Sequence, residues 1–199
     1  MYLKLSNKHN FVKNMQSGFT LVELLLVIAI GAILAVIGIP QARGLIIDGK
    51  VEPTASDVTK IVTKIRANFS GQGATPYTSM GATGPATAVF ANTARSLSSA
   101  LTVSGAGAAA TITHDIGETG ASITVDVVAN TTTGDSFDVT FPKVNNAACP
   151  GLATQLSKTA EKILINGSVV KPLNGVYAGG TAQNLCTSND TNTFVFTFR

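Results

Sequence analysis

The clearest pattern along the chain is a long apolar run near its N-terminus. The run extends from Phe19 to Ile39, and Glu23 is the single charged residue in it. A helix rising about 1.5 Å per residue would cross the hydrocarbon core of a bilayer, about 30 Å thick, over this length. A carboxylate there costs about 2.5–3.5 kcal/mol on insertion scales, so we expect Glu23 to have a partner and a function.

Beyond the run, the helical pattern meets helix-breaking residues and then resumes. Pro40 and Pro53 lack a backbone N–H, and Gly44 and Gly49 lie between them. We therefore predict that residues 40–69 form a kinked or locally melted second half of a long helix. Its apolar face consists of Ala55, Val58, Val62, Ile65 and Phe69. The spacing of these residues predicts that this face packs on a globular domain. The opposite face carries Asp57, Lys60, Lys64 and Arg66.

We predict that residues 70–199 form a globular domain that contains loops and helices. Residues 70–93 are rich in small and polar residues and predict a long surface loop, with a short helix at 91–101. Apolar residues at helical spacing predict another helix at 152–165, which Asn166-Gly167 ends. The glycine- and asparagine-rich stretch 174–184 is expected to be exposed.

The same domain contains segments in which apolar and polar residues alternate. This period of two predicts half-buried strands at 111–115, 122–129, 136–141 and 193–199. A hairpin turn is predicted at 131–135. The strands predict an antiparallel sheet with one wet face, and the helix after Pro53 covers the dry face. The fold class is therefore α+β.

Charge matters chiefly at the N-terminus. The 199 residues include 14 basic and 11 acidic ones, giving a net charge of +3. Lys4, Lys8 and Lys13 precede the apolar run without any acid, so the rest of the chain is formally neutral and no nucleic-acid partner is indicated. By the positive-inside rule these lysines keep the N-terminus in the cytoplasm, and everything after Ile39 faces outward.

Two ordinary explanations of the apolar run fit less well. A secretory signal peptide is cleaved after its apolar core, whereas here Gly18 precedes the run. A plain transmembrane anchor explains the length and hydrophobicity but gives no reason for Glu23.

The residues Gly18-Phe19-Thr20-Leu21-Val22-Glu23-Leu24 resemble the leader junction of type IV prepilins. The resemblance implies that residues 1–18 are a leader, removed by a prepilin peptidase between Gly18 and Phe19. The new N-terminus at Phe19 is then methylated. It also implies that Glu23 meets the corresponding amine of a neighbouring subunit, and that residues 19–39 form first a membrane span and then the filament core.

A second resemblance concerns the C-terminal half. Four segments are similar to type IVb major pilins of the thin-pilus group, found with conjugative plasmids and in enteric pathogens: 137–141, 147–149, 152–154 and 186–198. It implies a pilin fold, in which the long N-terminal helix packs on an antiparallel sheet and a disulfide closes residues 149–186. The long leader favours the IVb branch, although phenylalanine at the cut site is more usual in IVa.

Cys149 and Cys186 are the only cysteines. In a domain outside the cytoplasm such a pair is interpreted as a disulfide. The loop would close about 38 residues and contribute about 4 kcal/mol in the chain-entropy model. A metal site would need more ligands, and His9 and His114 offer no suitable spacing.

The sequence gives little support for catalysis. It has no nucleophile elbow, no phosphate-cradling glycine loop and no metal-spaced cluster, so we expect no enzyme and no cofactor. Asp126, Asp135 and Asp138 could form a surface calcium site, because some pseudopilins carry one. Solvated strand and turn acids are the favoured interpretation.

Together these features predict a structural protein, the major pilin of a type IV pilus that serves adhesion, cell-cell contact or conjugation, or motility. Its partners would be copies of itself in a helical filament, the prepilin peptidase, the inner-membrane assembly machinery and a host or recipient cell surface. The precursor would reside in the inner membrane and the product in an extracellular pilus. The alternatives are a pseudopilin of a type II secretion system, a minor pilin, and a membrane-anchored adhesin that never polymerises.

Overall fold

The computed structural model describes residues 18–81 and 85–199, which fall into two compact units. One unit ends at Pro40, and the other is Gln41–Arg199, called the head below. The predicted leader, apart from Gly18, lies outside the described residues, and so do Lys4, Lys8 and Lys13.

Helix α1 is one continuous helix, Leu21–Phe69, that contributes to both units. It remains helical at Pro40 and Pro53, so the predicted local melting is wrong, while the predicted kink at these prolines stays a prediction. A proline removes one hydrogen bond from a helix interior. Around Pro53 the burial of Val51 and Ala55, each 4% exposed, offsets that loss.

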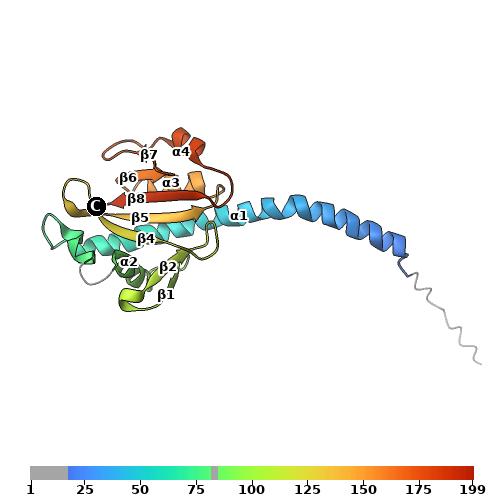
Figure 1. The fold of residues 1–199 in the computed structure, drawn as a ribbon, viewed down its shortest axis with the longest axis horizontal. Helices are drawn as coiled ribbons and strands as arrows, with labels where there is room; N and C mark the ends of the chain where they lie inside the picture. The colour runs from blue at the N-terminus through green and yellow to red at the C-terminus, as the bar shows by residue number, and fades with distance from the viewer. Residues whose placement is uncertain (1–17, 82–84) are drawn as a thin grey trace, which may run out of the picture. The chain divides into compact units, whose positions relative to one another are not determined.

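The main layer of the head is a five-stranded antiparallel sheet with strand order β4-β5-β8-β6-β7 (Figure 1). The C-terminal strand β8 therefore lies in the middle of the sheet, between β5 and β6. The strands are β4 Thr124–Ala129, β5 Thr133–Val144, β6 Lys162–Ile165, β7 Ser168–Lys171 and β8 Asn192–Phe198. The predicted strands at 122–129, 136–141 and 193–199 are confirmed, and so is the hairpin between the first two.

A smaller antiparallel sheet, with strand order β1-β2-β3, lies beside helix α2 in the head (Figure 1). Its strands are β1 Thr102–Ser104, β2 Thr111–His114 and β3 Ala121–Ser122. The predicted strand at 111–115 is confirmed as β2. The remaining helical segments are η1 Pro76–Gly81, α2 Ala86–Ala94, η2 Gly107–Ala109, α3 Cys149–Leu156 and α4 Gly179–Leu185.

The hydrophobic core joins α1 to one face of the larger sheet. Val58, Ile61, Val62 and Ile65 of α1 are fully buried. The sheet presents five fully buried phenylalanines to the same core, and their side chains alternate along β5 and β8: Phe137, Phe141, Phe194, Phe196 and Phe198. This confirms the predicted α+β layers, in which an apolar helix stripe covers the dry face of an antiparallel sheet.

The predicted helix at 152–165 is wrong in its second half. Helix α3 ends at Leu156, and residues 162–165 form strand β6. Asn166 and Gly167 have φ angles of 51° and 81°, as a two-residue turn between paired strands requires, so they join β6 to β7 instead of ending a helix. A short apolar run fits the periodicity of a helix and of a strand equally well, so the sequence pattern could not distinguish them here.

The predictions for two loop regions also need correction. The short helix expected at 91–101 is α2, Ala86–Ala94, which follows Pro85 and buries Phe90. The predicted loop at 70–93 contains η1 as well. The stretch 174–184 is mostly exposed, but it includes part of α4, where Ala182 is buried. These helices consist largely of small residues, which are also common in loops, so their composition alone does not distinguish them from loops.

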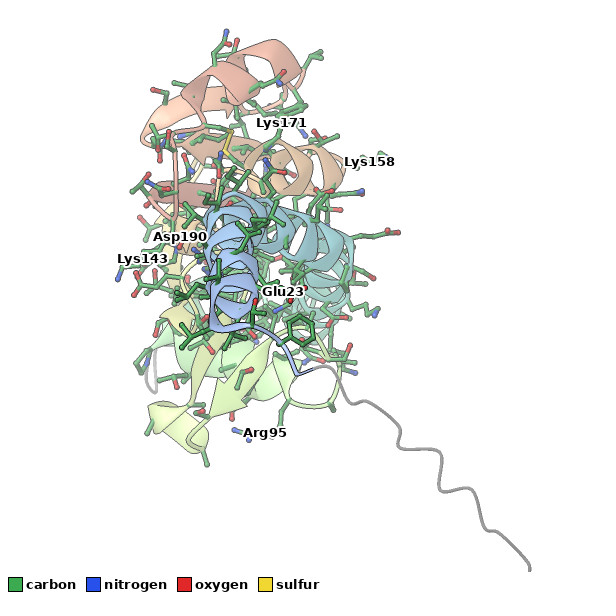
Figure 2. All side chains as sticks on the ribbon, turned by 90° about the vertical axis from the view of Figure 1, so that its right-hand side faces the viewer. Glu23, Arg95, Lys143, Lys158, Lys171 and Asp190 are labelled. Atoms are coloured by element: carbon green, nitrogen blue, oxygen red, sulfur yellow. A yellow bond between two sulfur atoms is a disulfide. The ribbon has the colours of Figure 1, made fainter. Side chains whose placement is uncertain are left out.

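Cys149 at the start of α3 and Cys186 just after α4 form a disulfide across a sequence separation of 37, as predicted. Figure 2 draws disulfide bonds in yellow. Cys149 itself is buried in the hydrophobic core. The bond therefore ties the loop that carries α4 to the core of the head.

Removing this disulfide should destabilise the head. For the double variant Cys149→Ala/Cys186→Ala we expect the free energy of unfolding to fall by about 2–4 kcal/mol, because the unfolded chain regains the entropy of the open loop. Denaturant titration of the full chain in detergent measures the loss, and the reduced wild type serves as the control. A variant as stable as the oxidised wild type would contradict this account.

Candidate processing and assembly site

The residues around the predicted cleavage point form the start of α1. Thr20 is the N-cap, because its carbonyl accepts the Leu24 N–H at 3.1 Å and its Oγ1 accepts the Glu23 N–H at 3.2 Å. Glu23 therefore occupies the third helical position, as in a capping box, where the helix dipole favours a carboxylate. The observed cap is thus made by the Thr20 side chain and the Glu23 backbone N–H. A threonine three residues before a glutamate is the sequence signal for such a cap.

The side chain of Glu23 is exposed on the first turn of α1 and is labelled in Figure 2. The ion pairs found among residues 18–81 and 85–199 are Arg43–Asp190, Lys60–Asp57 and Lys143–Glu118, and none of them includes Glu23. The N-cap thus explains where the helix starts but supplies no countercharge within the described chain.

The apolar run that follows has no cover of its own. Its large side chains from Phe19 to Ile39 are 50–76% exposed. In the described residues α1 is the one helix long and apolar enough to cross a membrane, with a mean hydropathy of 2.9 in its most apolar window and none of that window buried. Apolar surface of this extent requires lipid or other helices around it.

Just past Pro40, the head holds α1 through Arg43. Its guanidinium donates to Asp190 Oδ2 at 2.6 Å and to the Gly117 carbonyl at 3.3 Å. Asn145 donates to the other carboxylate oxygen of Asp190 at 2.6 Å. Burial would raise the pKa of Asp190, but the hydrogen bonds from Asn145 and Arg43 outweigh it and lower the pKa. The loop after Cys186 is thereby fastened to the first turns of α1 in the head.

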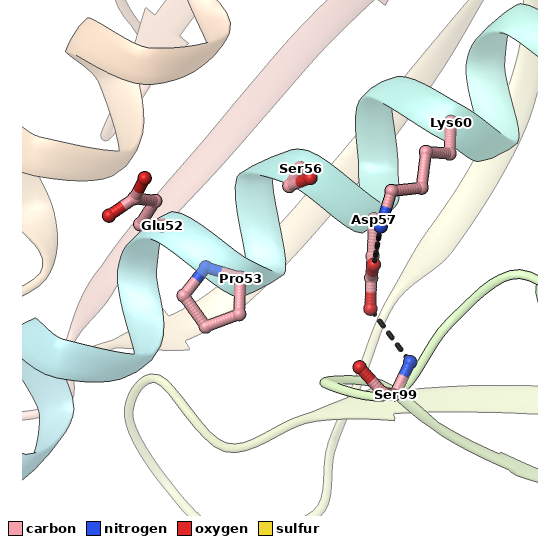
Figure 3. Close-up of a pocket in the computed structure, with 6 residues that line it drawn as sticks. All are labelled: Glu52, Pro53, Ser56, Asp57, Lys60 and Ser99. Carbon is pink, nitrogen blue, oxygen red and sulfur yellow. Dashed lines mark hydrogen bonds and ion pairs between the residues drawn. The ribbon is translucent and has the colours of Figure 1, made fainter.

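Asp57 fastens a second loop to α1, and the prediction that it lies on the polar face of the helix is wrong. It was placed on the polar outer face of the helix, but it is 2% exposed. Its Oδ2 accepts the backbone N–H groups of Ser99 and Ala100 at 2.8 and 3.0 Å, and the Ser98 hydroxyl at 3.0 Å. Lys60 lies 2.9 Å from Oδ1 at the rim of a shallow hollow (Figure 3). Asp57 thus fixes the loop between α2 and β1.

The environment of Asp57 favours its charged form. Burial alone would raise the pKa of this carboxyl, but the hydrogen bonds from the loop and from Lys60 outweigh burial and lower the pKa to about 2. A depressed folded-state pKa stabilises the fold above the unfolded pKa, and that stabilisation is lost as the pH falls through the folded value.

The three aspartates considered for calcium have separate environments. Asp135 is buried and accepts the backbone N–H groups of Asn130 and Thr131, so it is not a solvated turn acid. Burial would raise its pKa, but these and hydroxyl hydrogen bonds hold the pKa well below its usual value. Asp126 and Asp138 face each other across β4 and β5, and Asp138 accepts the Thr197 hydroxyl. In the described part of the chain the three do not form one metal-holding group.

Two solved structures are similar to this chain. A crystal structure of a type IV b pilin from Salmonella typhi is 24% identical, covers 71% of this chain and 95% of its own, and has a TM-score of 0.49. TcpA, a type IV pilin from the Vibrio cholerae El Tor biotype, is 15% identical, with coverages of 76% and 99% and a TM-score of 0.51. The long N-terminal helix, the antiparallel sheets and the disulfide form the α+β pilin fold, as the resemblance implied.

Sequence comparison places the chain in a family. The prokaryotic N-terminal methylation motif matches residues 13–39. The PilS N terminal family matches residues 50–199, most of the chain, and the chain belongs to that family. No curated protein sequence matches it. A methylation motif that includes an apolar N-terminal helix makes this a type IV pilin-like protein, a membrane-anchored precursor that becomes part of an extracellular pilus.

Replacing the buried Asp57 carboxylate should weaken the head and change its response to acid. We expect Asp57→Asn to lower the free energy of unfolding at pH 7 by about 1–3 kcal/mol, because a charged acceptor of three loop donors is lost. As the pH is lowered from 3.8 to about 2, Asp57 takes up a proton and the free energy of unfolding of the wild type should decrease. The variant should lack this pH-dependent decrease. Denaturant titrations across this pH range measure both effects.

Glu52→Gln is the matched control, since Glu52 is an exposed carboxylate on the same helix. It should leave both the stability at pH 7 and the acid response unchanged. Equal behaviour of the two variants would contradict the role given to Asp57.

Proposed function

We propose that this chain is the major subunit of a type IVb pilus, cut between Gly18 and Phe19, methylated at Phe19 and polymerised into an extracellular filament. The observation that carries the proposal is the uncovered apolar half of α1, which lies within the methylation motif at residues 13–39 and is followed along the chain by a folded, disulfide-closed head. The pilin fold shared with TcpA, itself a type IV pilin, supports it.

Assembly would replace one apolar environment with another. Before assembly, lipid covers residues 19–39, and in the filament the same residues pack against copies of themselves. Helix contacts then replace lipid contacts, so there is little net hydrophobic opposition to leaving the bilayer. The work of extrusion would come from the inner-membrane assembly machinery.

Glu23 would set the register of each incoming subunit. Cleavage creates a cationic amine at Phe19, and the carboxylate of Glu23 on a neighbouring copy is its natural partner. Each charge alone is costly in an apolar surrounding, but attraction strengthens at low dielectric when the geometry is good. The pair would therefore form only where two subunits meet correctly.

The processing step can be tested on material sheared from the cell surface. We expect long filaments built from a chain whose intact mass begins at methylated Phe19 and includes the Cys149–Cys186 disulfide. A chain cut at Gly18 that stays in the membrane without filaments would indicate a pseudopilin or minor pilin instead. A chain that still begins at Met1 would contradict all three.

The role of the Glu23 charge can be tested by a substitution that leaves the Thr20 cap in place. Glutamine at the third helical position keeps the hydrogen-bonding capacity of a capping box but removes the charge. We expect Glu23→Gln to be processed normally and yet to reduce surface filaments at least tenfold, measured by shearing and immunoblotting. Glu52→Gln, which removes an exposed carboxylate elsewhere on α1, should leave filaments unchanged. Wild-type filament levels in Glu23→Gln would contradict the role given to the charge.

A further inference from the structure

His114, the last residue of β2, is a buried titratable side chain that joins the smaller sheet to the larger one. It is 1% exposed, and its ring centroid lies 5.5 Å from that of Phe141. Its Nε2 lies 2.8 Å from the backbone carbonyl of Pro142 in β5. Because a carbonyl can only accept a hydrogen bond, Nε2 carries the proton and donates it.

The other ring nitrogen of His114 has no such contact. Nδ1 is buried, and within residues 18–81 and 85–199 it has no hydrogen-bond partner. A second proton would therefore create a buried charge and an N–H group without an acceptor. Burial lowers the pKa of this imidazole below its usual value, although the Pro142 carbonyl and the Asp115 carboxylate act in the opposite direction. The closed head thus favours the neutral ring.

The charged groups on the elements around β2 do not change this balance. Those groups are Asp115, Glu118, Lys143, Asp190, Arg43, Lys50 and Arg95. Glu118 is paired with Lys143 at 2.8 Å. Asp190 is paired with Arg43 at 2.6 Å. Asp115, the neighbour of His114 in the chain, favours the protonated ring, but it makes no hydrogen bond to Nδ1.

The segment directly after His114 lies along the end of β5. This segment, residues 115–120, is called the strap below. The Asn145 N–H donates to the Ile116 carbonyl at 3.0 Å, and the Glu118 N–H donates to the Lys143 carbonyl at 3.0 Å. Two backbone hydrogen bonds therefore hold the strap on β5, next to the bond that His114 makes to the same strand.

Gly117, between these two bonds, connects the strap to α1. It lies so close to β5 that an added Cβ would clash with the Lys143 carbonyl. Its own carbonyl accepts the Arg43 guanidinium at 3.3 Å. The strap is thus held by His114 at its start and holds part of the Arg43 attachment at its centre.

Acid acts on the strap through the buried ring. When the strap opens, water reaches His114 and its pKa returns toward the usual 6.5. The open form then binds a proton more readily than the closed form, so a lower pH favours opening. The stabilisation from the neutral ring is present above about pH 6.5 and is lost as the pH falls toward the lower value of the closed head.

We propose that His114 is a pH-sensitive switch, whose protonation in mildly acidic medium releases the strap from β5 and removes the Gly117 contact of Arg43. Arg43 keeps its ion pair with Asp190, so α1 stays attached to the head by one contact fewer. The switch works within a single subunit and does not depend on polymerisation.

Amide hydrogen exchange at different pH values tests the switch on the full chain in detergent. Every sample carries His9→Gln, so that His114 is the one histidine present. Exchange is followed at the Glu118 and Asn145 amides and corrected for the intrinsic pH dependence of the exchange reaction. We expect their opening constants to rise by up to about tenfold between about pH 7.5 and pH 5.5. The Phe196 amide, in the central strand β8, should keep its opening constant.

Two variants serve as controls for the ring. His114→Gln keeps an N–H donor for the Pro142 carbonyl but does not titrate, so it should lose the pH response. Adding Thr111→His to this variant places a histidine at an exposed position of the same strand and should not restore the response. Nitrogen-15 shifts of the wild-type imidazole give an independent reading, and they should show a neutral ring, protonated on Nε2, below pH 6.5 while the strap is closed.

The outcomes separate the switch from the proposed function. Constant opening of the Glu118 and Asn145 amides, or an equal pH response in His114→Gln, would overturn the switch. An imidazole that is charged at pH 6.5 in the closed head would also overturn it. These measurements need no filaments, so their failure leaves the pilin function standing, and a wild type without filaments leaves the switch standing.

Discussion

The packing of the apolar face of α1 on the phenylalanine face of the five-stranded sheet is the interaction on which the other features depend. Ile61 and Ile65 of the helix and Phe137 and Phe196 of the sheet are completely buried in one core. This contact gives the second half of α1 a partner within its own chain. Residues 21–39 are just as apolar, but they have no sheet to cover them. Within the described residues, the first part of the main helix is therefore left uncovered.

The packing of α1 on the sheet also depends on the C-terminal region. Strand β8 lies at the centre of the sheet, so residues 192–198 must be in place before the core is complete. Asn192 is fully buried, donates to the carbonyls of Val144 and Thr187, and accepts from Asn166 and from Thr187. A buried polar network of this kind fixes one arrangement, because any partner that moves leaves another group unpaired.

That network also positions the attachment to α1. The loop between Cys186 and Asn192 carries Asp190, which pairs with Arg43 just beyond Pro40. The disulfide holds one end of this loop and the central strand holds the other. Arg43 is therefore held in part by a residue that lies 147 positions away in the sequence.

Most of the layer architecture could be predicted from the sequence, because long segments with a consistent period need little context. The alternation in β4, β5 and β8 and the apolar stripe of α1 are signals of that kind. Short segments failed where two periods fit equally well, as at residues 162–165, or where a glycine turn resembled a helix end, as at Asn166-Gly167. Asp57 and Asp135 were assigned to solvent because their partners are mainly backbone N–H groups of loops, which leave no mark in composition.

Glu23 illustrates how local helix structure can serve the assembly role that we propose for the same residue. Its backbone N–H donates to Thr20 Oγ1 at the N-cap, which favours the start of α1 at Leu21, close to the predicted cut after Gly18. A frayed helix start would place the carboxylate and the new amine at variable positions, and an ion pair at low dielectric stabilises only when its geometry is well defined. The cap would therefore support the proposed charge pair instead of competing with it. On this argument, a helix that begins cleanly beside the cleavage point is itself a requirement for subunits to meet in register.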